Sequence, residues 1–455
     1  MPEGRGVFLT AQERTTALPT ISTSDHPARR PYPSKLFVEI TSRCNLGCFM
    51  CVKQTGGGCI AEGDLSAAHF AALEPAFPTL EALLLNGVGE PLLHPHLEAF
   101  IRRAKELMPA GSTVGFQSNG LLLTPQRALA LAEAGLDRIC LSVDASTPEI
   151  FRQLRQGGEL PAIDNAFAAL QRAREVSGRN DLQIGAEVVV MRDNLSALPA
   201  TLEWAAQRGA TFALVTHMLP YDQAHAGQGV YVSCTDAAIA HFQQWQERAR
   251  QEGVAMERYF EILFKFAKSP EEQRIIAFVE RMKAAAEEEG LFLDLSKLFS
   301  IDLSWIAHVE EIFAQARRVA ARNHLDLQLP QVAPKAERLC HFVEEGGAFV
   351  SWQGEIHPCY FLWHQYNCFA SGWQQPVRPR IFGHLDQSDI LAVWNDPAFS
   401  RFRQNVIAYD YPHCISCRLA PCDYVQAEEF EQDCHVKDEP CGSCLWCMGL
   451  FQCLR

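Results

Sequence analysis

The chain has 455 residues, a hydrophobic content of 48% and a formal net charge of −14 from 40 Lys and Arg against 54 Asp and Glu. The length suits two or three domains with sizeable cores, and the negative charge disfavours nucleic-acid and anionic-membrane partners. The N-terminal residues lack the apolar core of a secretory signal, and no stretch approaches the roughly 20 apolar residues that span a bilayer. We therefore expect a cytoplasmic protein with no membrane and no nucleic-acid partner.

Seventeen cysteines are many for such a protein, because disulfides do not persist in a reducing compartment. They are also clustered. Three lie close together at Cys44, Cys48 and Cys51, and eight fall within the last 42 residues. This clustering indicates thiolate ligands for metal rather than isolated buried cysteines.

The first part of the chain alternates between strand-like and helix-like segments. Residues 1–34 are rich in Thr, Pro, Ser and Arg and predict an N-terminal tail. Amphipathic segments of helical period follow, for example at 96–108 and 125–135. Short apolar runs between them predict six strands at 36–40, 82–86, 113–118, 138–143, 183–191 and 211–216. This alternation over 35–228 predicts an α/β fold with a mainly parallel sheet, a full or partial barrel with its chemistry at the carboxyl ends of the strands.

The pattern changes twice after residue 228. Residues 229–335 contain long helical segments, including 271–290 and 306–324, and predict a helical insertion or connector. From 336 to 455 the composition turns to Cys, Trp, His, Pro and Gly with little periodicity. This composition is typical of a small domain stabilised by metal.

The first group of cysteines has the spacing C-x3-C-x2-C and directly follows the first predicted strand. Three thiolates leave one iron of a 4Fe-4S cluster without a protein ligand, so a small molecule can chelate that iron. A zinc site is the alternative, but structural zinc normally takes four protein ligands.

At these residues the sequence resembles the radical S-adenosylmethionine (SAM) superfamily, and the resemblance covers residues 36 to about 225. It implies a partial (β/α)6 TIM-like barrel. It also implies that Cys44, Cys48 and Cys51 hold a catalytic 4Fe-4S cluster, which cleaves SAM reductively to a 5′-deoxyadenosyl radical that abstracts hydrogen from a substrate. Met50 departs from the aromatic residue that many members carry beside the last cysteine, which affects the expected packing against adenine.

Further matches follow successive predicted strands in the order of the family. Gly87, Gly89 and Glu90 resemble the motif that holds the SAM amino group, with glycines for close backbone approach and Glu90 as counter-charge to an ammonium. Asn119 resembles the next element and is suited to a positive φ. The resemblance thus assigns SAM binding to Gly87, Gly89, Glu90, Asn119, Ser142, Asp144 and Arg155.

Two other polar residues on predicted strands have open roles. Glu187 is either a core-facing polar residue or a substrate contact, and His217 is a structural histidine or a substrate-side candidate. The sequence assigns no catalytic residue beyond the cluster ligands.

The C-terminal region contains the pattern C-x13-G-x4-C at Cys340, Gly354 and Cys359, followed by further cysteines. This pattern resembles the SPASM extension of radical SAM maturases, which implies two auxiliary 4Fe-4S clusters. Gln426 stands where the common pattern has another cysteine, so the last ligand must come from further along the chain. We assign the auxiliary ligands collectively to Cys340, Cys359, Cys414, Cys417, Cys422, Cys434, Cys441, Cys444 and Cys453, with Cys368 and Cys447 as further candidates. Zinc binding by the C-x2-C pairs is the alternative.

Longer strings such as 357–368 and 433–453 resemble a SPASM subgroup regarded as maturases of metalloenzymes, including tungsten or molybdenum oxidoreductases. The resemblance implies a maturase that acts on a peptide, a protein or an enzyme-bound cofactor, with flavodoxin or ferredoxin as electron donor. A small-molecule radical SAM dehydrogenase or epimerase would share these motifs. An iron–sulfur scaffold or electron-transfer protein would explain the cysteines but not the motifs after the strands.

Overall fold

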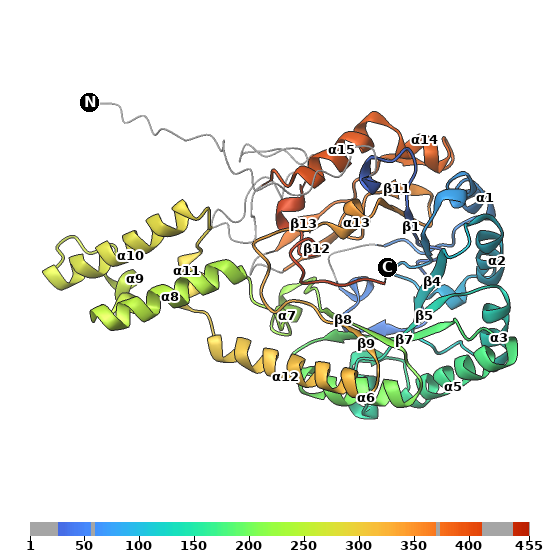
Figure 1. Cartoon of the computed structure of the whole chain (residues 1–455), viewed down its shortest axis with the longest axis horizontal. Coiled ribbons are helices and arrows are strands. Elements are labelled where there is room, and N and C mark those ends of the chain that lie inside the picture. Colours follow the sequence, from blue (N-terminus) through green and yellow to red (C-terminus); the bar gives the residue numbers. More distant parts are fainter. Residues whose placement is uncertain (1–25, 56–59, 370–373, 412–439, 455) are drawn as a thin grey trace.

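The fold is a curved, mostly parallel sheet with helices along its outer side and a helical arm (Figure 1). The computed structural model describes residues 26–55, 60–369, 374–411 and 440–454. Cys414, Cys417, Cys422 and Cys434 lie outside the described residues.

The six predicted strands are all confirmed and run parallel to one another in the sheet. Each is short and buried, as expected of strands covered on both faces. In sheet order they are β1 (Lys35–Val38), β3 (Ala82–Leu84), β4 (Thr113–Ser118), β5 (Arg138–Ser142), β7 (Gln183–Val190) and β8 (Phe212–His217).

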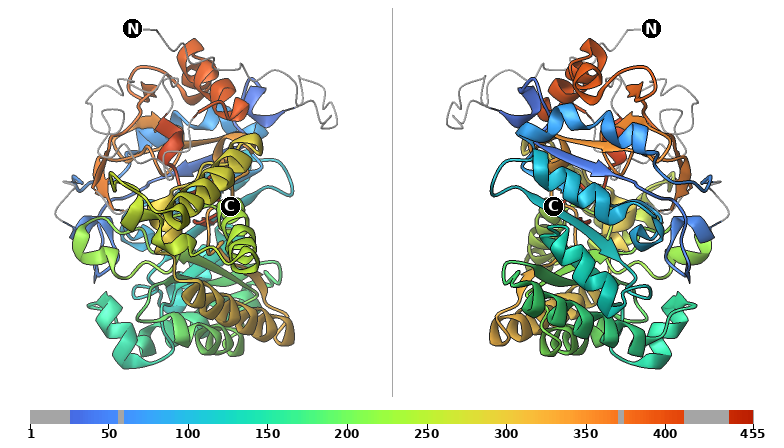
Figure 2. Two further views of the ribbon diagram at one scale, coloured as in Figure 1. Left: turned by 90° about the vertical axis from the view of Figure 1, so that its left-hand side faces the viewer. Right: turned by 90° about the vertical axis from the view of Figure 1, so that its right-hand side faces the viewer.

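The outer helices explain why the strands connect in parallel. They are α2 (Leu97–Leu107), α3 (Pro125–Glu133), α5 (Leu160–Ser177) and α6 (Leu198–Gln207), which line the outer side of the sheet in Figures 1 and 2. Helix α2 buries Leu97, Phe100, Ile101 and Ala104. This spacing of i, i+3, i+4 and i+7 forms one apolar stripe that packs on the strands.

The sheet continues beyond the six strands at both edges. Strands β10 (Gly347–Val350), β11 (Glu355–His357) and β14 (Gly383–His384) extend it from β1, and β9 (Asp326–Gln328) adds to β8, in the order β14-β11-β10-β1-β3-β4-β5-β7-β8-β9. Strand β10 pairs in parallel with β1, with Lys35 opposite Gly347 and Val38 opposite Val350. The cysteine-rich C-terminal part therefore shares one sheet with the barrel, which stays open as expected of a partial barrel.

Residues 234–299 form the arm, which projects from the barrel and has a hydrophobic core of its own (Figure 1). It contains α8 (Asp236–Glu252), α9 (Tyr259–Ile262), α10 (Pro270–Glu288) and α11 (Leu295–Phe299). Helix α10 begins with a capping box between Ser269 and Glu272, which satisfies donors at the helix start. The next helix, α12 (Leu303–Arg322), packs on α6 and buries Phe313 in the main core, so this part of the predicted connector belongs structurally to the barrel. No helix of the described segments is long and apolar enough to cross a membrane.

The described segments contain further strands and α-helices. They are β2 (Gly47–Cys48), α1 (Ala67–Ala71), α4 (Pro148–Leu154), β6 (Arg155–Gln156), α7 (Gln223–Ala226), α13 (His341–Glu344), β12 (Tyr366–Cys368), β13 (Gln375–Val377), α14 (Ile390–Trp394) and α15 (Pro397–Ala408).

Residues 26–34, which we assigned to the tail, are packed against α14 and α15. Ala28 is buried, and its carbonyl accepts a hydrogen bond from Nε of Arg403 at 2.9 Å. Nε1 of Trp394 donates to the carbonyl of Arg30 at 2.9 Å. These buried contacts join the segment before β1 to the C-terminal part.

The last described segment, 440–454, lies across the space between β1 and β8. The Gln452 amide donates to Oγ1 of Thr216 on β8 at 3.1 Å, and Gln452 lines one cavity together with Phe37 of β1. The carbonyl of Gly449 accepts a hydrogen bond from the Gln331 amide at 2.9 Å. The C-terminal segment therefore fills part of the opening that the incomplete barrel leaves.

Candidate active site

The loop after β1 brings Cys44, Cys48 and Cys51 to the wall of one cavity of about 280 Å³, which we call the central cavity. The loop is held by its own hydrogen bonds and by a two-stranded pairing of β2 with β6. The Cys51 amide donates to the Cys48 carbonyl at 3.1 Å, and the Phe49 amide donates to the Leu154 carbonyl at 2.9 Å. The cysteine positions are thus fixed by backbone contacts within the loop and to the segment 154–156.

The donor set of this loop fits a 4Fe-4S cluster with one open iron. Among the described residues, no fourth cysteine lines the central cavity. Burial raises the pKa of Cys48, and it raises the pKa of Cys51 to about 11. Such thiols are protonated at neutral pH in the absence of metal, so metal binding must displace their protons.

Most of the predicted SAM contacts line the same cavity. Gly87, Gly89 and Glu90 come from the loop after β3, Asn119 from the end of β4, Ser142 from the end of β5 and Arg155 from β6. Because the carboxyl ends of parallel strands meet at one edge of a sheet, the residues after β3, β4 and β5 converge here, and the pairing of β6 with β2 adds Arg155.

The two glycines are required by close packing against the loop after β1. A Cβ on Gly87 would lie 2.2 Å from Cγ of Glu39, and a Cβ on Gly89 would lie 2.3 Å from the carbonyl oxygen of Thr41. The Glu90 amide donates to the Arg43 carbonyl at 2.7 Å, which holds the two loops together. The close backbone approach predicted for these glycines is thus an approach to the loop that carries the cysteines.

Glu90 is buried and binds three donors of its own chain. Its Oε1 accepts from the Leu92 amide at 3.0 Å and from Oγ of Ser118 at 2.8 Å, and its Oε2 accepts from the Asn119 amide at 2.7 Å. Burial raises the pKa of Glu90, while these hydrogen bonds favour its charged form. The carboxylate therefore ties the loop after β3 to the end of β4 and faces the central cavity from that position.

Asn119 also holds the cysteine loop. Its Nδ2 donates to Oδ1 of Asn45 at 2.8 Å, and its Oδ1 accepts from the Leu121 amide at 3.1 Å. The positive φ that we expected at Asn119 occurs at Gly120, with φ of 75°. A glycine at this position adopts that conformation without the steric cost of a Cβ.

Asp144 differs from the other predicted SAM contacts because it does not line the central cavity. It is 1% exposed and forms an ion pair with Arg155, with Oδ2 and Nε 2.8 Å apart. Its Oδ1 accepts from the Val189 amide at 2.8 Å. Asp144 thus lies behind Arg155 and positions the guanidinium that reaches the cavity.

Glu187 lines the central cavity from β7, so of its two predicted roles the structure favours the one that faces a ligand. Its Oε2 accepts from Oγ of Ser142 at 3.3 Å. Burial raises the pKa of Glu187, and the nearby charge of Arg155 opposes this shift. A buried carboxylate beside a buried guanidinium is able to hold or release a proton at the cavity wall.

His217 is a core histidine. Its Nε2 lies 2.7 Å from the carbonyl oxygen of Gln331, and its ring packs against Tyr231 and Phe313. Burial lowers the pKa of His217 to about 4, so the ring is neutral at physiological pH. The substrate-side role is therefore not supported by its position.

Several cavity residues were not predicted. Asn86 and Gln117 pair through two hydrogen bonds of 2.7 Å, and Tyr221 and Trp363 add aromatic surface. Burial raises the pKa of Tyr221, and the charges of Cys51, Cys368 and Cys453 raise it further, so its hydroxyl lies within electrostatic reach of cysteines from both groups. Trp363 comes from the C-terminal region, where no periodic pattern marks which face of the chain is buried.

Four of the predicted auxiliary ligands line a second cavity, which we call the C-terminal cavity. They are Cys340, Cys359, Cys444 and Cys453. Phe37, Phe361 and Phe451 enclose them, and burial raises the pKa of Cys340 to about 12. Four cysteines around one apolar cavity are the donor set of a fully ligated iron–sulfur cluster or of structural zinc.

The remaining described cysteines of this region lie outside that cavity. Cys441 is buried. Burial raises the pKa of Tyr411, and the charges of Cys441 and Cys447 raise it further. Sγ of Cys447 donates to the Cys444 carbonyl at 3.2 Å. Cys368 is buried on β12 near Tyr366. Cys441 and Cys447 thus share one neighbourhood around Tyr411.

Two family models match the chain at the sites just described. Residues 38–205 match the radical SAM superfamily, and residues 340–418 match the SPASM iron–sulfur cluster-binding domain. The chain therefore contains a radical SAM domain and a C-terminal SPASM domain.

Among curated relatives, one similarity extends over nearly the whole chain. The tungsten-containing aldehyde ferredoxin oxidoreductase cofactor-modifying protein of Pyrococcus furiosus is 28% identical over 423 residues, which cover 92% of this chain and 96% of the relative. The AdoMet-dependent heme synthase of Methanosarcina barkeri is 27% identical over 52% of this chain and 66% of its own length. The GTP 3′,8-cyclase of Pelotomaculum thermopropionicum is 33% identical over 28% of this chain and 38% of its own length.

Among solved structures, SuiB of Streptococcus suis bound to S-adenosylmethionine has a TM-score of 0.47 at 12% identity, over 82% of this chain and 68% of SuiB. The anSMEcpe structure with bound AdoMet has a TM-score of 0.44 at 12% identity, over 82% and 83% of the two chains.

Proposed function

We propose that the chain is a radical SAM maturase that modifies a peptide, a protein or an enzyme-bound cofactor. The observation that carries this proposal is the convergence of Cys44, Cys48 and Cys51 with a polar wall on one central cavity. When bound there, a 4Fe-4S cluster and SAM would supply the 5′-deoxyadenosyl radical that abstracts hydrogen from the substrate.

The chain's own residues would bind and orient SAM. Three cysteines leave one iron open for chelation, and Arg155 offers a guanidinium that matches a carboxylate. Glu90 and Glu187 offer negative charge for the amino group and the sulfonium, and Asn119 and Ser142 offer hydrogen-bond partners for the ribose. Asp144 would act indirectly, by holding Arg155 in place.

The maturase assignment, as distinct from any radical SAM reaction, is supported by the relative from Pyrococcus furiosus. Its name states that it modifies the cofactor of a tungsten-containing aldehyde ferredoxin oxidoreductase, and the similarity spans 96% of its length. We propose a substrate of the same kind, with a flavodoxin or ferredoxin as electron donor in the cytoplasm.

For the auxiliary metal, we propose that Cys340, Cys359, Cys444 and Cys453 hold one 4Fe-4S cluster at the C-terminal cavity. A second cluster would take its four ligands from among Cys414, Cys417, Cys422, Cys434, Cys441 and Cys447. Because Tyr221 lines the central cavity and is within electrostatic reach of Cys453, the first auxiliary cluster would lie close to the central cavity. That proximity suits electron transfer to or from the substrate.

The test is anaerobic reconstitution followed by reduction with dithionite in the presence of SAM. Formation of 5′-deoxyadenosine is expected, and its absence from protein with intact clusters would exclude the radical SAM reaction. A scaffold or electron-transfer protein would bind iron without this product. A maturase is separated from a dehydrogenase or epimerase by comparing an apo-oxidoreductase with a panel of small molecules as candidate substrates. A maturase would consume SAM in response to the apo-oxidoreductase, whereas a dehydrogenase or epimerase would do so in response to a small molecule.

A further inference from the structure

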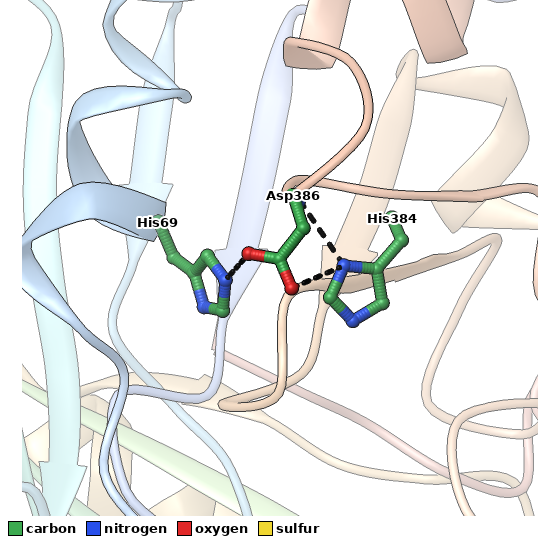
Figure 3. Close-up of side chains that lie close together, drawn as sticks. All are labelled: His69, His384 and Asp386. Carbon is green, nitrogen blue, oxygen red and sulfur yellow. Dashed lines mark hydrogen bonds and ion pairs between the residues drawn. The ribbon is translucent and has the colours of Figure 1, made fainter.

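A cluster of two histidines and one aspartate lies outside the central and C-terminal cavities, between α1 of the barrel and the edge of the sheet. His69 comes from α1, His384 from β14 and Asp386 from the turn that follows (Figure 3). Nε2 of His69 lies 2.7 Å from Oδ1 of Asp386, and Nδ1 of His384 lies 3.4 Å from Oδ2 of the same carboxylate. The three candidate ligand atoms all lie within 4.8 Å of one another.

The position of His69 is fixed by packing rather than by solvent-exposed contacts. Its side chain is 15% exposed and lies over Gly354, where a Cβ would be 2.9 Å from Cε1 of the ring. Gly354 has a φ of 93°, which favours glycine for a second reason. His384 is held on a strand that pairs with β11. Two of the three ligands therefore stand on regular elements, which lowers the entropy lost when they bind an ion.

The local charge favours a cation. Asp386 carries its charge at neutral pH, because the hydrogen bond with His69 and the charge of His384 lower its pKa. Glu355 is the register partner of His384 across the β11–β14 pair, and its own pKa is lowered by His357 and His384. The carboxylates of Asp386 and Glu355 thus lie beside the histidine rings of this cluster.

We propose that His69, His384 and Asp386 bind one divalent transition-metal ion, with zinc as the ion that this donor set suits. Two imidazoles and a carboxylate are the protein ligands of open zinc sites, whose fourth position takes water. Tetrahedral bonds of about 2 Å separate ligand atoms by about 3.3 Å, so the present separations require shifts of about 1 Å. This site is independent of the proposed radical chemistry.

Binding exchanges existing contacts rather than creating a new fold. The ion would replace the proton shared by Nε2 of His69 and the Asp386 carboxylate. Nδ1 of His384 now accepts a hydrogen bond from the backbone amide of Asp386 at 3.1 Å. Because Asp386 is exposed, water can accept the hydrogen bond of that amide once Nδ1 binds the ion. The ion would join α1 of the radical SAM domain to β14 of the C-terminal part.

The test uses the full chain with its iron–sulfur clusters loaded, purified without an affinity tag and dialysed against zinc. We expect about one zinc per chain in addition to the iron of the clusters. The X-ray absorption spectrum of zinc should show nitrogen and oxygen ligands at about 2.0 Å rather than sulfur ligands at about 2.3 Å. The double variant His69→Gln and Asp386→Asn keeps side chains that can form hydrogen bonds but should weaken zinc binding by at least about tenfold.

The matched control is His308→Ala, which removes an exposed histidine of α12 and should leave zinc binding unchanged. Iron and sulfide contents of all variants must equal those of the unaltered chain, so that zinc in cysteine sites is counted equally. The proposal is overturned if the double variant retains the same zinc, if only sulfur ligands are seen, or if the cluster-loaded chain takes up no zinc.

Discussion

Arg155 and Cys48 face each other across the β2–β6 pair, and Nη1 of Arg155 donates to Sγ of Cys48 at 3.9 Å. On its other side the guanidinium forms the ion pair with Asp144. One buried cation thus contacts both a cysteine of the proposed cluster loop and a carboxylate at the end of β5. This arrangement couples the stability of the loop to a residue outside the central cavity.

Replacing Asp144 by Ala should therefore lower the free energy of unfolding by about 3–5 kcal/mol, because it leaves a buried guanidinium without its partner. Urea unfolding under anaerobic conditions measures this change. The control is Arg152→Ala, which breaks an exposed ion pair with Glu159 and should cost less than about 1 kcal/mol. Equal effects of the two variants would contradict the buried coupling.

The proposed clusters should be lost separately. Cys48→Ala should remove about four irons per chain and abolish 5′-deoxyadenosine formation, while Cys359→Ala should remove about four irons and leave SAM binding intact. Iron analysis and SAM-dependent changes in the electron paramagnetic resonance spectrum distinguish the two. Cys234→Ala, in the core of the arm, should lose no iron. Loss of SAM binding in Cys359→Ala would argue against separate sites.

Gly89→Ala should displace the loop after β3 from the cysteine loop, because the new Cβ would lie 2.3 Å from the Thr41 carbonyl oxygen. We expect a loss of stability of about 1–3 kcal/mol and weaker SAM binding, measured by urea unfolding and by equilibrium dialysis. The control is Gly227→Ala, where a Cβ meets no atom within 4 Å. Unchanged SAM affinity in Gly89→Ala would show that the two loops move independently.

The chain should lose stability between pH 6.5 and pH 4 through His217. Its folded pKa of about 4 lies below the usual value of 6.5, so the unfolded chain binds the proton more strongly in this range. The contribution of the neutral buried ring to the free energy of unfolding is fully present above pH 6.5 and falls as the pH drops. Between pH 7.5 and pH 5.5 the loss should be about 1 kcal/mol.

The variant His217→Gln lacks this titration and should lose correspondingly less unfolding free energy between the two pH values. The variant His308→Ala, which changes an exposed histidine, should behave like the unaltered chain. The comparison is made by urea unfolding at the two pH values. An equal pH dependence in His217→Gln and the unaltered chain would mean that other groups account for the acid sensitivity.

The sequence predicted the barrel strands well because each is a short apolar run bounded by turn residues. Strand β4 coincides with the predicted 113–118. It did not predict β10 or β14, since these strands of four and two residues lie in a region without periodicity. Helix α12 was predicted as a helix, but its packing on α6 depends on tertiary contacts that a helical period does not specify.

At the site, the cysteine spacing and the residues after the strands were visible because each motif is local. The position of Asp144 behind Arg155 could not be predicted from the sequence, because a motif gives a residue type but not the direction of its side chain. Tyr221 and Trp363 reach the central cavity from a loop and from the C-terminal region, and only the folded chain brings them together.

The hydrogen bond between Gln452 and Thr216 has a consequence for biosynthesis. A barrel strand that leaves the ribosome early waits for a segment made more than 200 residues later before its contacts are complete. Until then, the apolar surface around Phe37 that this segment covers would stay accessible, and domains that expose such surface during synthesis are prone to aggregate. The proposed cluster of the C-terminal cavity takes Cys444 and Cys453 from this segment, so its assembly is expected to wait until the segment has been synthesised.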